Sequence, residues 1–244
     1  MSDTTTKALI CKVPVRIYDS TQNDPWENWF SNEAIVTFAA LYSIAIGLNP
    51  MPFSVSATSI ALILFNEETP TRNQKEFVKK GLMDLYEIDS RWLEPQNDNM
   101  TKWEINTSIL FEPYKNNNYI YTYFSFYELR LIYKYTKYKN KTDVMAFYIK
   151  FRSIFDYKHK YRIEHFSQDK MKTIFKMSKS SISDHLTEFV KIGLICCYEP
   201  KSVHGKDNHF YSLSNIYYLP GSYEIAEAYA EELRNNYIKI MNKY

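Results

Sequence analysis

Two segments of this chain, 112 residues apart, have nearly the same sequence. Residues 76–87 read EFVKKGLMDLYE and residues 188–199 read EFVKIGLICCYE, so eight of twelve positions agree without a gap. Upstream, Phe53-Ser54 and Phe166-Ser167 hold similar places at an offset of 113. A solenoid would have a shorter period, of about 20–50 residues. The repeat therefore predicts two copies of one module, with chance similarity between helix-forming segments as the alternative.

The composition predicts a globular protein of one large or two small domains. The chain has 244 residues, of which 45% are hydrophobic and 17% aromatic, enough to bury a core. Cys11, Cys196 and Cys197 form no disulfide framework, which favours a reducing cytosol. The N-terminus lacks the apolar core of a signal peptide, and the most apolar run, residues 34–47, is too short to span a bilayer. We therefore expect a cytoplasmic protein with no membrane partner and with a buried helix at 34–47.

In the first half, the hydrophobic pattern predicts a strand, three helices and a two-stranded hairpin. The first strand is expected at 8–18, and Ser31 and Thr69 are the expected N-caps of the first and third helices. The expected helices cover residues 32–46, 57–65 and 70–86, and the expected hairpin strands cover 87–95 and 102–111.

The second half repeats this order, with helices that lead into a hairpin. Ser167 and Ser178 are the expected N-caps of the last two helices before the hairpin, and Gly193 is expected to end the second of them. The expected helices cover residues 124–138, 142–155, 168–176 and 179–192, and the expected strands cover 162–166, 194–199 and 209–213.

Residues 142–213, and above all FSQDKMKTIFKMSKSSISDHLTEFVKIGLI, resemble the winged-helix domains of bacterial transcription regulators and of plasmid or phage replication proteins. In that family a capped helix, a tight turn and a second capped helix lead through a Gly-Leu-Ile step into the wing hairpin. The stretch VPVRIYDS…WFSNEAIVTFAALYSI is similar to the first strand and helix of N-terminal winged helices in replication initiators from low-GC Gram-positive bacteria.

The fold class expected from this order and this resemblance is mainly α with small β-hairpins (α+β). Two tandem winged helix-turn-helix domains are expected at residues 1–114 and 115–215. A C-terminal helix within 216–244 is expected to serve packing or dimerisation.

Charge is distributed unevenly along the chain. Residues 1–114 carry 9 Lys and Arg against 15 Asp and Glu, whereas residues 115–215 carry 18 against 9. Such asymmetry favours a polyanion, here double-stranded DNA, as the partner of the second half. A solvated lysine-rich face is the alternative.

The expected DNA contacts come from the exposed face of the last helix in each copy and from the second wing. Small hydroxyl residues can approach phosphates and base edges closely, and long donors in a wing can reach the backbone or the minor groove. In the second half the expected DNA-binding residues are Arg162, Lys170, Lys172, Lys179, Ser180, Ser181, Ser183, Asp184, Thr187, Lys191, Lys201, Ser202, His204, Lys206 and Asn208. In the first half they are Arg72, Asn73, Lys75 and Lys79, beside Lys80, with contact to another protein as the alternative for that copy.

The repeated segment itself is expected to serve packing and not recognition. In the second copy one apolar helix face is formed by Ile182, Leu186, Phe189 and Val190. Gly193 permits a left-handed turn at the helix end, and Leu194 then re-enters the core. The first copy is interpreted in the same way, as core and C-cap.

The C-terminal helix, expected from Tyr223 to about Asn242, carries an apolar seam about three heptads long. The seam consists of Ala226, Ala230, Leu233, Tyr237 and Ile240, with Tyr244 after them. It predicts a homodimer, because proteins that bind two DNA half-sites with two-fold symmetry need a symmetric interface between their subunits. The alternative is that the seam packs on the chain's own winged helix.

No catalytic constellation, cofactor motif or metal site is expected. Adjacent Cys196 and Cys197 lack the C-x₂₋₄-C spacing of structural zinc sites, although His204 and His209 follow them. The five histidines contain no His-x-His pair of the nickase type, and the chain has no phosphate-binding glycine loop.

The leading hypothesis is therefore a non-enzymatic, sequence-specific double-stranded-DNA-binding protein. A replication initiator or replisome organiser of a plasmid or phage is one reading, and a transcription regulator that represses a promoter operator is the other. Replication or transcription machinery would be its further partner. A protein-interaction module with incidental basic charge is a third possibility.

Overall fold

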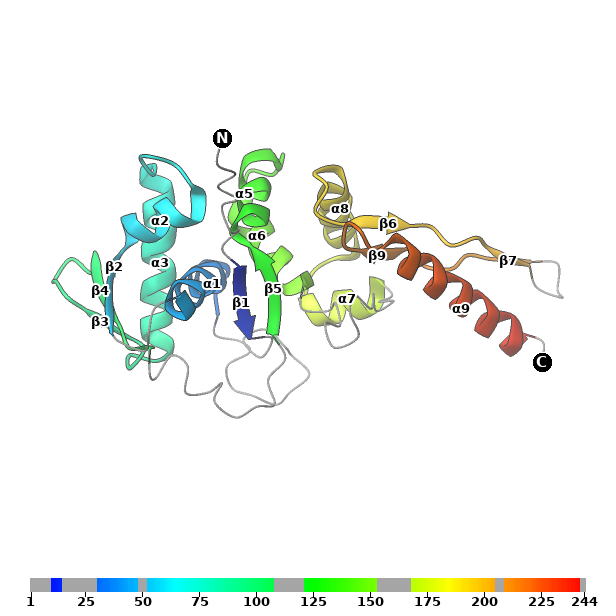
Figure 1. The fold of residues 1–244 in the computed structure, drawn as a ribbon, viewed down its shortest axis with the longest axis horizontal. Coiled ribbons are helices and arrows are strands. Elements are labelled where there is room, and N and C mark those ends of the chain that lie inside the picture. The colour runs from blue at the N-terminus through cyan, green and yellow to red at the C-terminus, as the bar shows by residue number, and fades with distance from the viewer. Residues whose placement is uncertain are drawn as a thin grey trace, which may run out of the picture. The chain divides into compact units, whose positions relative to one another are not determined.

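The computed structural model describes residues 10–14, 30–47, 52–107, 121–152, 168–204 and 209–241. The chain divides into two compact units, Met1–Ser153 (unit 1) and Ile154–Tyr244 (unit 2). Each unit combines helices with small antiparallel sheets, so the protein is a mixed α+β fold (Figure 1).

Unit 1 is built around one buried helix. Its elements in chain order are β1 (Ile10–Pro14), α1 (Asn32–Gly47), β2 (Phe53–Ser56), α2 (Ala57–Phe65), α3 (Arg72–Ile88), β3 (Leu93–Pro95), β4 (Lys102–Ile105), β5 (Tyr121–Ser125), α5 (Phe126–Tyr135) and α6 (Lys141–Arg152). Helix α1 packs against α3, α6 and β1, and Figure 1 shows it between α3 on one side and the β1–β5 pair on the other. Because neighbours surround it, every side chain from Ala34 to Tyr42 is buried. The apolar run that the sequence singled out is therefore a buried helix, as predicted.

A three-stranded sheet closes the first half of unit 1. Its strand order is β2-β4-β3, and both pairings are antiparallel, with Phe53 and Leu93 on either side of Ile105. Trp103 of β4 and Trp92, just before β3, are buried, and the Trp92 ring packs against Phe38 of α1 with the ring centroids 5.9 Å apart. The sequence prediction missed β2, because four residues directly before a helix are too short to show a period and their pairing partner lies far along the chain.

The sequence suggested a domain boundary after residue 114, but the division between the two units lies after Ser153. Strand β5 pairs with β1 in the register Ile10↔Ser125 to Pro14↔Tyr121. Helices α5 and α6 then pack on α2 and α1, and they bury the side of α1 that α3 leaves open. Residues 121–152 thus complete the core of unit 1 and do not begin the second module.

Unit 2 contains two short helices, a long hairpin and a terminal helix. Its elements are α7 (Gln168–Phe175), α8 (Lys179–Lys191), β6 (Cys196–Tyr198), β7 (Val203–His204), β8 (Phe210–Tyr211), β9 (Ile216–Tyr218) and α9 (Tyr223–Met241). The pairs Cys196↔Tyr218 and His204↔Phe210 share one register, because both arms advance by eight residues between them. We call the two arms, 196–204 and 210–218, the hairpin. Helix α9 packs along it, so the described residues 216–241 are not a separate part (Figure 1).

The two copies of the repeated segment fold differently after their shared glycine. Gly193 has φ +77, and Leu194 N–H donates to Phe189 O at 2.9 Å while Gly193 N–H donates to Val190 O at 3.1 Å. These two bonds form a Schellman C-cap, which confirms the predicted role of Gly193. Gly81, in contrast, lies inside α3, which continues to Ile88. The interpretation of the first copy as a C-cap was therefore wrong.

Gly81 is required by a close contact between helices. A Cβ atom at this position would lie 2.2 Å from Thr37 Oγ1 and 2.5 Å from the carbonyl oxygen of Glu33, both on α1. The absence of a side chain lets α3 approach α1 closely. The contact between these two helices is the most extensive helix contact in unit 1. The same residue type thus serves helix packing in one copy and helix termination in the other.

Most helix starts agree with the sequence prediction, because capping is a local interaction. Ser31 Oγ accepts from Ala34 N–H at 3.0 Å, and Ser178 Oγ accepts from Ser181 N–H at 3.1 Å, so both predicted caps are confirmed. The third helix starts two residues later than expected. Thr71, and not Thr69, is its cap, and a capping box joins Thr71 to Gln74.

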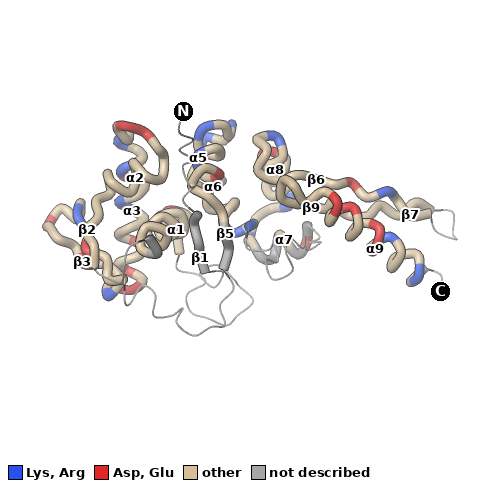
Figure 2. The backbone as a smooth tube through the Cα atoms, viewed as in Figure 1, with Lys and Arg blue, Asp and Glu red and all other residues tan. Residues whose placement is uncertain are grey.

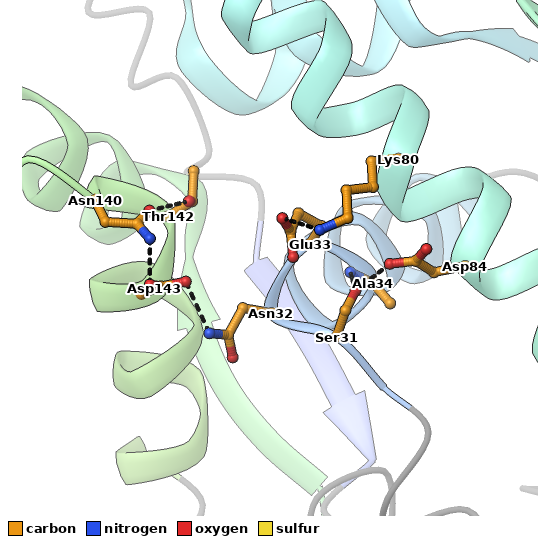
Figure 3. Close-up of polar contacts among 9 residues, drawn as sticks. All are labelled: Ser31, Asn32, Glu33, Ala34, Lys80, Asp84, Asn140, Thr142 and Asp143. Carbon is orange, nitrogen blue, oxygen red and sulfur yellow. Dashed lines mark hydrogen bonds and ion pairs between the residues drawn. The ribbon is translucent and has the colours of Figure 1, made fainter. Parts of the chain in front are cut away.

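A polar cluster ties the start of α1 to α3 on one side and to α6 on the other (Figure 3). Towards α3, Glu33 pairs with Lys80 at 2.7 Å and Ser31 donates to Asp84. Towards α6, Asn32 Nδ2 donates to Asp143 Oδ1 at 2.8 Å. The cluster fixes the orientation of α3 and α6 around the central helix.

The strand expected at 162–166 and the Ser167 cap lie outside the described residues, as do parts of the elements expected at 8–18, 102–111 and 142–155. Among the helices that are described, none has a stretch long and apolar enough to traverse a bilayer.

Candidate nucleic-acid interface

Helices α7 and α8 of unit 2 follow one another in the chain and pack together. A turn of three residues joins them, and its first residue, Lys176, has φ +52, a left-handed conformation that reverses the chain sharply. Ser178 then caps α8. Met171 and Phe175 of α7 and Ile182, Leu186 and Phe189 of α8 are buried, so these side chains form the core contacts of the two helices. Val190, which the sequence placed on the same apolar face, is instead 37% exposed, because it lies about 100° around the helix from Phe189. This packing leaves the opposite face of α8 outward.

The outward face of α8 carries a polar stripe. Ser180, Asp184, Thr187 and Lys191 follow i, i+4, i+7, i+11 spacing, and all four side chains are exposed. We call these residues the α8 stripe. Hydroxyls, a carboxylate and an ammonium group can donate to or accept from base edges and phosphates, so the stripe offers the chemistry needed to contact a DNA groove.

Other predicted residues of α7 and α8 lie beside the stripe. Ser181 is half-buried, and its Oγ lies 2.8 Å from that of Ser178, so it belongs to the helix cap. Ser183 is half-buried as well, whereas Lys172 on α7 is exposed. Lys179 forms an ion pair with Asp169 at 2.7 Å, with both side chains largely exposed. That pair joins the starts of α7 and α8, and solvent keeps it weak.

The hairpin adds exposed polar residues at a distance from α8. Lys201, Ser202 and His204 are exposed, as predicted for a wing. The sequence prediction missed Phe210, which lies opposite His204 with the rings 4.8 Å apart and is 74% exposed. A phenylalanine next to a hairpin turn gives no distinctive signal in the sequence. Lys206, Asn208 and Arg162 lie outside the described residues, and Lys170 lies on α7 without a described side chain.

In unit 1 the predicted basic face of α3 is partly occupied by internal contacts. Arg72 and Asn73 are exposed and Lys75 and Lys79 are half-buried. Lys80 is engaged by Glu33. Burial raises the pKa of the Glu33 carboxyl, but the hydrogen bond and charge of Lys80 outweigh burial, so this pKa lies below its ordinary value. The same hydrogen bond raises the pKa of Lys80.

The predicted dimerisation seam on α9 lies largely on the hairpin of the same chain. Ala226 and Ala230 are buried, and the Tyr237 ring packs against Tyr211 of β8 at 5.9 Å. Leu233 is half-buried, and the side chain of Ile240 is not among those described. Packing within the chain therefore accounts for the first two turns of the seam, while dimerisation stays a prediction.

The two adjacent cysteines of β6 are both half-buried. Burial, with a contribution from Glu199, raises the pKa of the Cys197 thiol, and a neutral thiol is a weak nucleophile and metal ligand. Among the described side chains, no three His, Cys, Asp or Glu residues come together as a metal site requires.

Much of the positive charge on which the DNA prediction depended belongs to unit 1 and not to unit 2. Of the excess within 115–215, residues 115–153 carry eight Lys and Arg against two Asp and Glu, and these residues belong to unit 1. Residues 154–215 carry ten against seven. The densest basic segment therefore lies in α5 and directly after it, and not in α7 and α8.

Comparison of the chain with protein-family models, with curated proteins and with solved structures finds no match. Function is accordingly inferred from the residues themselves.

Proposed function

We propose that this chain is a non-enzymatic protein that binds double-stranded DNA sequence-specifically, with α8 as the helix that enters the major groove. The observation that carries the proposal is the α8 stripe, which faces outward from the packed helices α7 and α8, and the chain continues from α8 into the hairpin. A helix fits the major groove, where the base edges are distinguishable. Each arm of the hairpin is about 30 Å long, so it can act as a wing that reaches phosphates or the minor groove.

Unit 1 supports a second winged helix. Its central elements run α1, β2, α2, α3, β3, β4, with the sheet order β2-β4-β3, which is the arrangement expected of helices followed by a wing. In this copy α3 would be the recognition helix. Because Glu33 engages Lys80, we expect α3 to contribute less to duplex binding than α8.

The tandem arrangement favours a replication initiator of a plasmid or phage, and repression of a promoter is the alternative. DNase footprinting of the full chain on its own upstream DNA separates the two. Protection of iterated direct repeats near an origin supports replication. Protection of one palindrome over a promoter supports repression.

The test of the DNA interface is the pair of changes Lys179→Ala and Lys191→Ala. Each lysine is exposed at one end of α8, so their removal should weaken duplex binding without unfolding unit 2. The slope of log K against log salt should become shallower by about 0.9 for each phosphate that is no longer neutralised. Lys239→Ala, an exposed lysine on α9, is the matched control and should leave the slope unchanged. Equal slopes in all three proteins would refute the role of α8.

The start of the α9 seam is buried within its own chain, so a homodimer would have to form through another surface. Light scattering at tens of micromolar decides whether the unmutated chain associates at all. A monomer under those conditions would remove dimerisation from the proposal and leave the two tandem modules to set the spacing of DNA contacts.

A further inference from the structure

The basic segment at residues 126–141 lines a groove in unit 1. The groove has a volume of about 630 Å³ and lies between the end of α2 and the outer face of α5. Tyr127, Tyr135, Arg130, Lys134 and Lys141 line it, with Glu67 opposite. We call it the α5 groove. Its volume suits a ligand, since binding pockets usually measure about 300–1,000 Å³.

Two tyrosines with large exposed rings stand at either end of α5. Tyr127 is 62% exposed and Tyr135 is 55% exposed. They are eight residues apart, which corresponds to about 12 Å along the helix axis. A single base cannot stack on both rings, whereas two bases of one extended strand can.

The groove carries more positive than negative charge, because Arg130, Lys134 and Lys141 line it against Glu67. Residues 126–141 contain five Lys and Arg, and their one acid, Glu128, is turned inward to the hydroxyl of Tyr148 at 2.7 Å. Figure 2 shows Lys and Arg residues along α5 and in the segment that follows it. The basic residues continue past the groove to Lys137 and Lys139, both exposed, which fits a chain of phosphates better than one compact anion.

Two of the cations also hold the groove in shape. Arg130 donates to the carbonyl oxygen of Ile63 near the end of α2, and Lys141 Nζ donates to that of Tyr133 at 2.7 Å, near the end of α5. These bonds satisfy carbonyl groups that a helix end leaves open. Lys134 is exposed, and its Nζ lies over the Tyr135 ring at 5.1 Å from the centroid, so a cation and an aromatic ring stand together at this end of the groove.

We propose that the α5 groove binds single-stranded nucleic acid, with bases stacked on Tyr127 and Tyr135 and phosphates neutralised by Lys134 and its neighbours. An acidic peptide would use the lysines but would gain little from the exposed aromatic rings, so the rings favour nucleic acid. The site lies in unit 1 and uses none of the residues assigned to duplex recognition in unit 2. It stands or falls independently of the proposed function.

The experiment measures fluorescence anisotropy of labelled (dT)₁₂ and (rU)₁₂ with the full chain. Lys179→Ala with Lys191→Ala serves as the background, so that the duplex interface contributes least. Tyr127→Ala with Tyr135→Ala should weaken binding by at least about tenfold. Tyr127→Phe with Tyr135→Phe should retain it within about twofold, because the ring remains.

Charge variants complete the test. Lys134→Ala should make the salt slope shallower by about 0.7, the value for one phosphate of a single strand. Lys102→Ala, an exposed lysine on β4 of the same unit, should not. The two probes show whether DNA or RNA is preferred.

Three outcomes would overturn the proposal. One is the absence of (dT)₁₂ and (rU)₁₂ binding at about 100 µM, and another is unchanged binding after both tyrosines become alanine. The third is displacement of (dT)₁₂ by polyglutamate of equal charge as effectively as by unlabelled (dT)₁₂, which would assign the groove to acidic peptides. Duplex binding by the unmutated chain is measured separately, so failure here does not bear on α8.

Discussion

At the scale of single residues, substitution of the two glycines of the repeated segment is expected to destabilise the fold for different reasons. An added side chain meets other atoms at Gly81, whereas at Gly193 it strains the backbone. Gly81→Ala places a Cβ within 2.5 Å or less of Thr37 Oγ1 and Glu33 O, so α3 must move away from α1. We expect a loss of about 2–3 kcal/mol, the cost of overpacking a core. Thermal unfolding followed by circular dichroism should show a fall in Tm of about 6 °C or more.

Gly193→Ala is the matched change in unit 2. No atom lies within 4 Å of the added Cβ, so its cost comes only from φ +77. A left-handed conformation costs an alanine about 1–2 kcal/mol, and urea unfolding should show that smaller loss. A Gly81→Ala protein as stable as the unmutated one would mean that α3 does not approach α1 as closely as described.

The ion pair between Glu33 and Lys80 predicts a dependence of stability on pH. Because the pKa of Glu33 is lowered on folding, the pair stabilises the fold above the ordinary carboxyl pKa, and this stabilisation is lost as the pH falls through the lowered value. Lys80→Met should therefore lower Tm at pH 7, and the difference from the unmutated protein should shrink towards pH 3. The effect is small because Lys80 is largely exposed. A Tm difference that stays constant between pH 7 and pH 3 would contradict it.

At the scale of elements, α9 tests whether its apolar seam serves its own chain. Ala230 is 4% exposed against the hairpin, so Ala230→Glu should force a charge into that contact and lower the Tm of unit 2. Glu231→Ala, on an exposed neighbouring position, is the control and should have little effect. The Tm of the unmutated chain should not change with concentration. A Tm that rises with concentration would instead indicate that a second chain covers the seam.

Secondary-structure elements that depend on interactions between nearby residues were predicted more accurately than those that depend on distant segments of the chain. Helix α2 was predicted at its observed bounds, and α8 within one residue, because their apolar spacing and serine caps are local features. The strand expected at 87–95 was predicted too long, since only Leu93–Pro95 pairs there, and of the described residues 102–107 only Lys102–Ile105 pair. Backbone pairing depends on segments distant in the chain, which no short window contains.

At the scale of the whole molecule, the position of the unit boundary predicts how the chain can be cut. A fragment of residues 1–153 should fold, because it keeps α5 and α6 on α1. A fragment of residues 1–114 should not, because the face of α1 that α6 covers would meet water. The heteronuclear NMR spectrum of each fragment provides the measurement, with dispersed amide signals expected only for the longer one. A dispersed spectrum from 1–114 would restore the boundary expected from the sequence.

The sequence alone determined the mixed class of the fold, the buried helix at 34–47 and the helix ends fixed by Ser31, Ser178 and Gly193. It also located the outward stripe of α8, because the spacing of apolar residues in an amphipathic helix shows which face is polar. These features depend on residues within a few turns of one another.

Only the tertiary structure decided what the repeated segment and the basic charge are for. The same EFVK-x-GL sequence continues as a helix where α1 packs against Gly81, and it stops at Gly193 where Leu194 turns back into the core. Likewise, the lysines of residues 126–141 line a groove because α5 packs on α2 of unit 1. Local sequence left both outcomes open, since the free energy that separates them comes from neighbours far away along the chain.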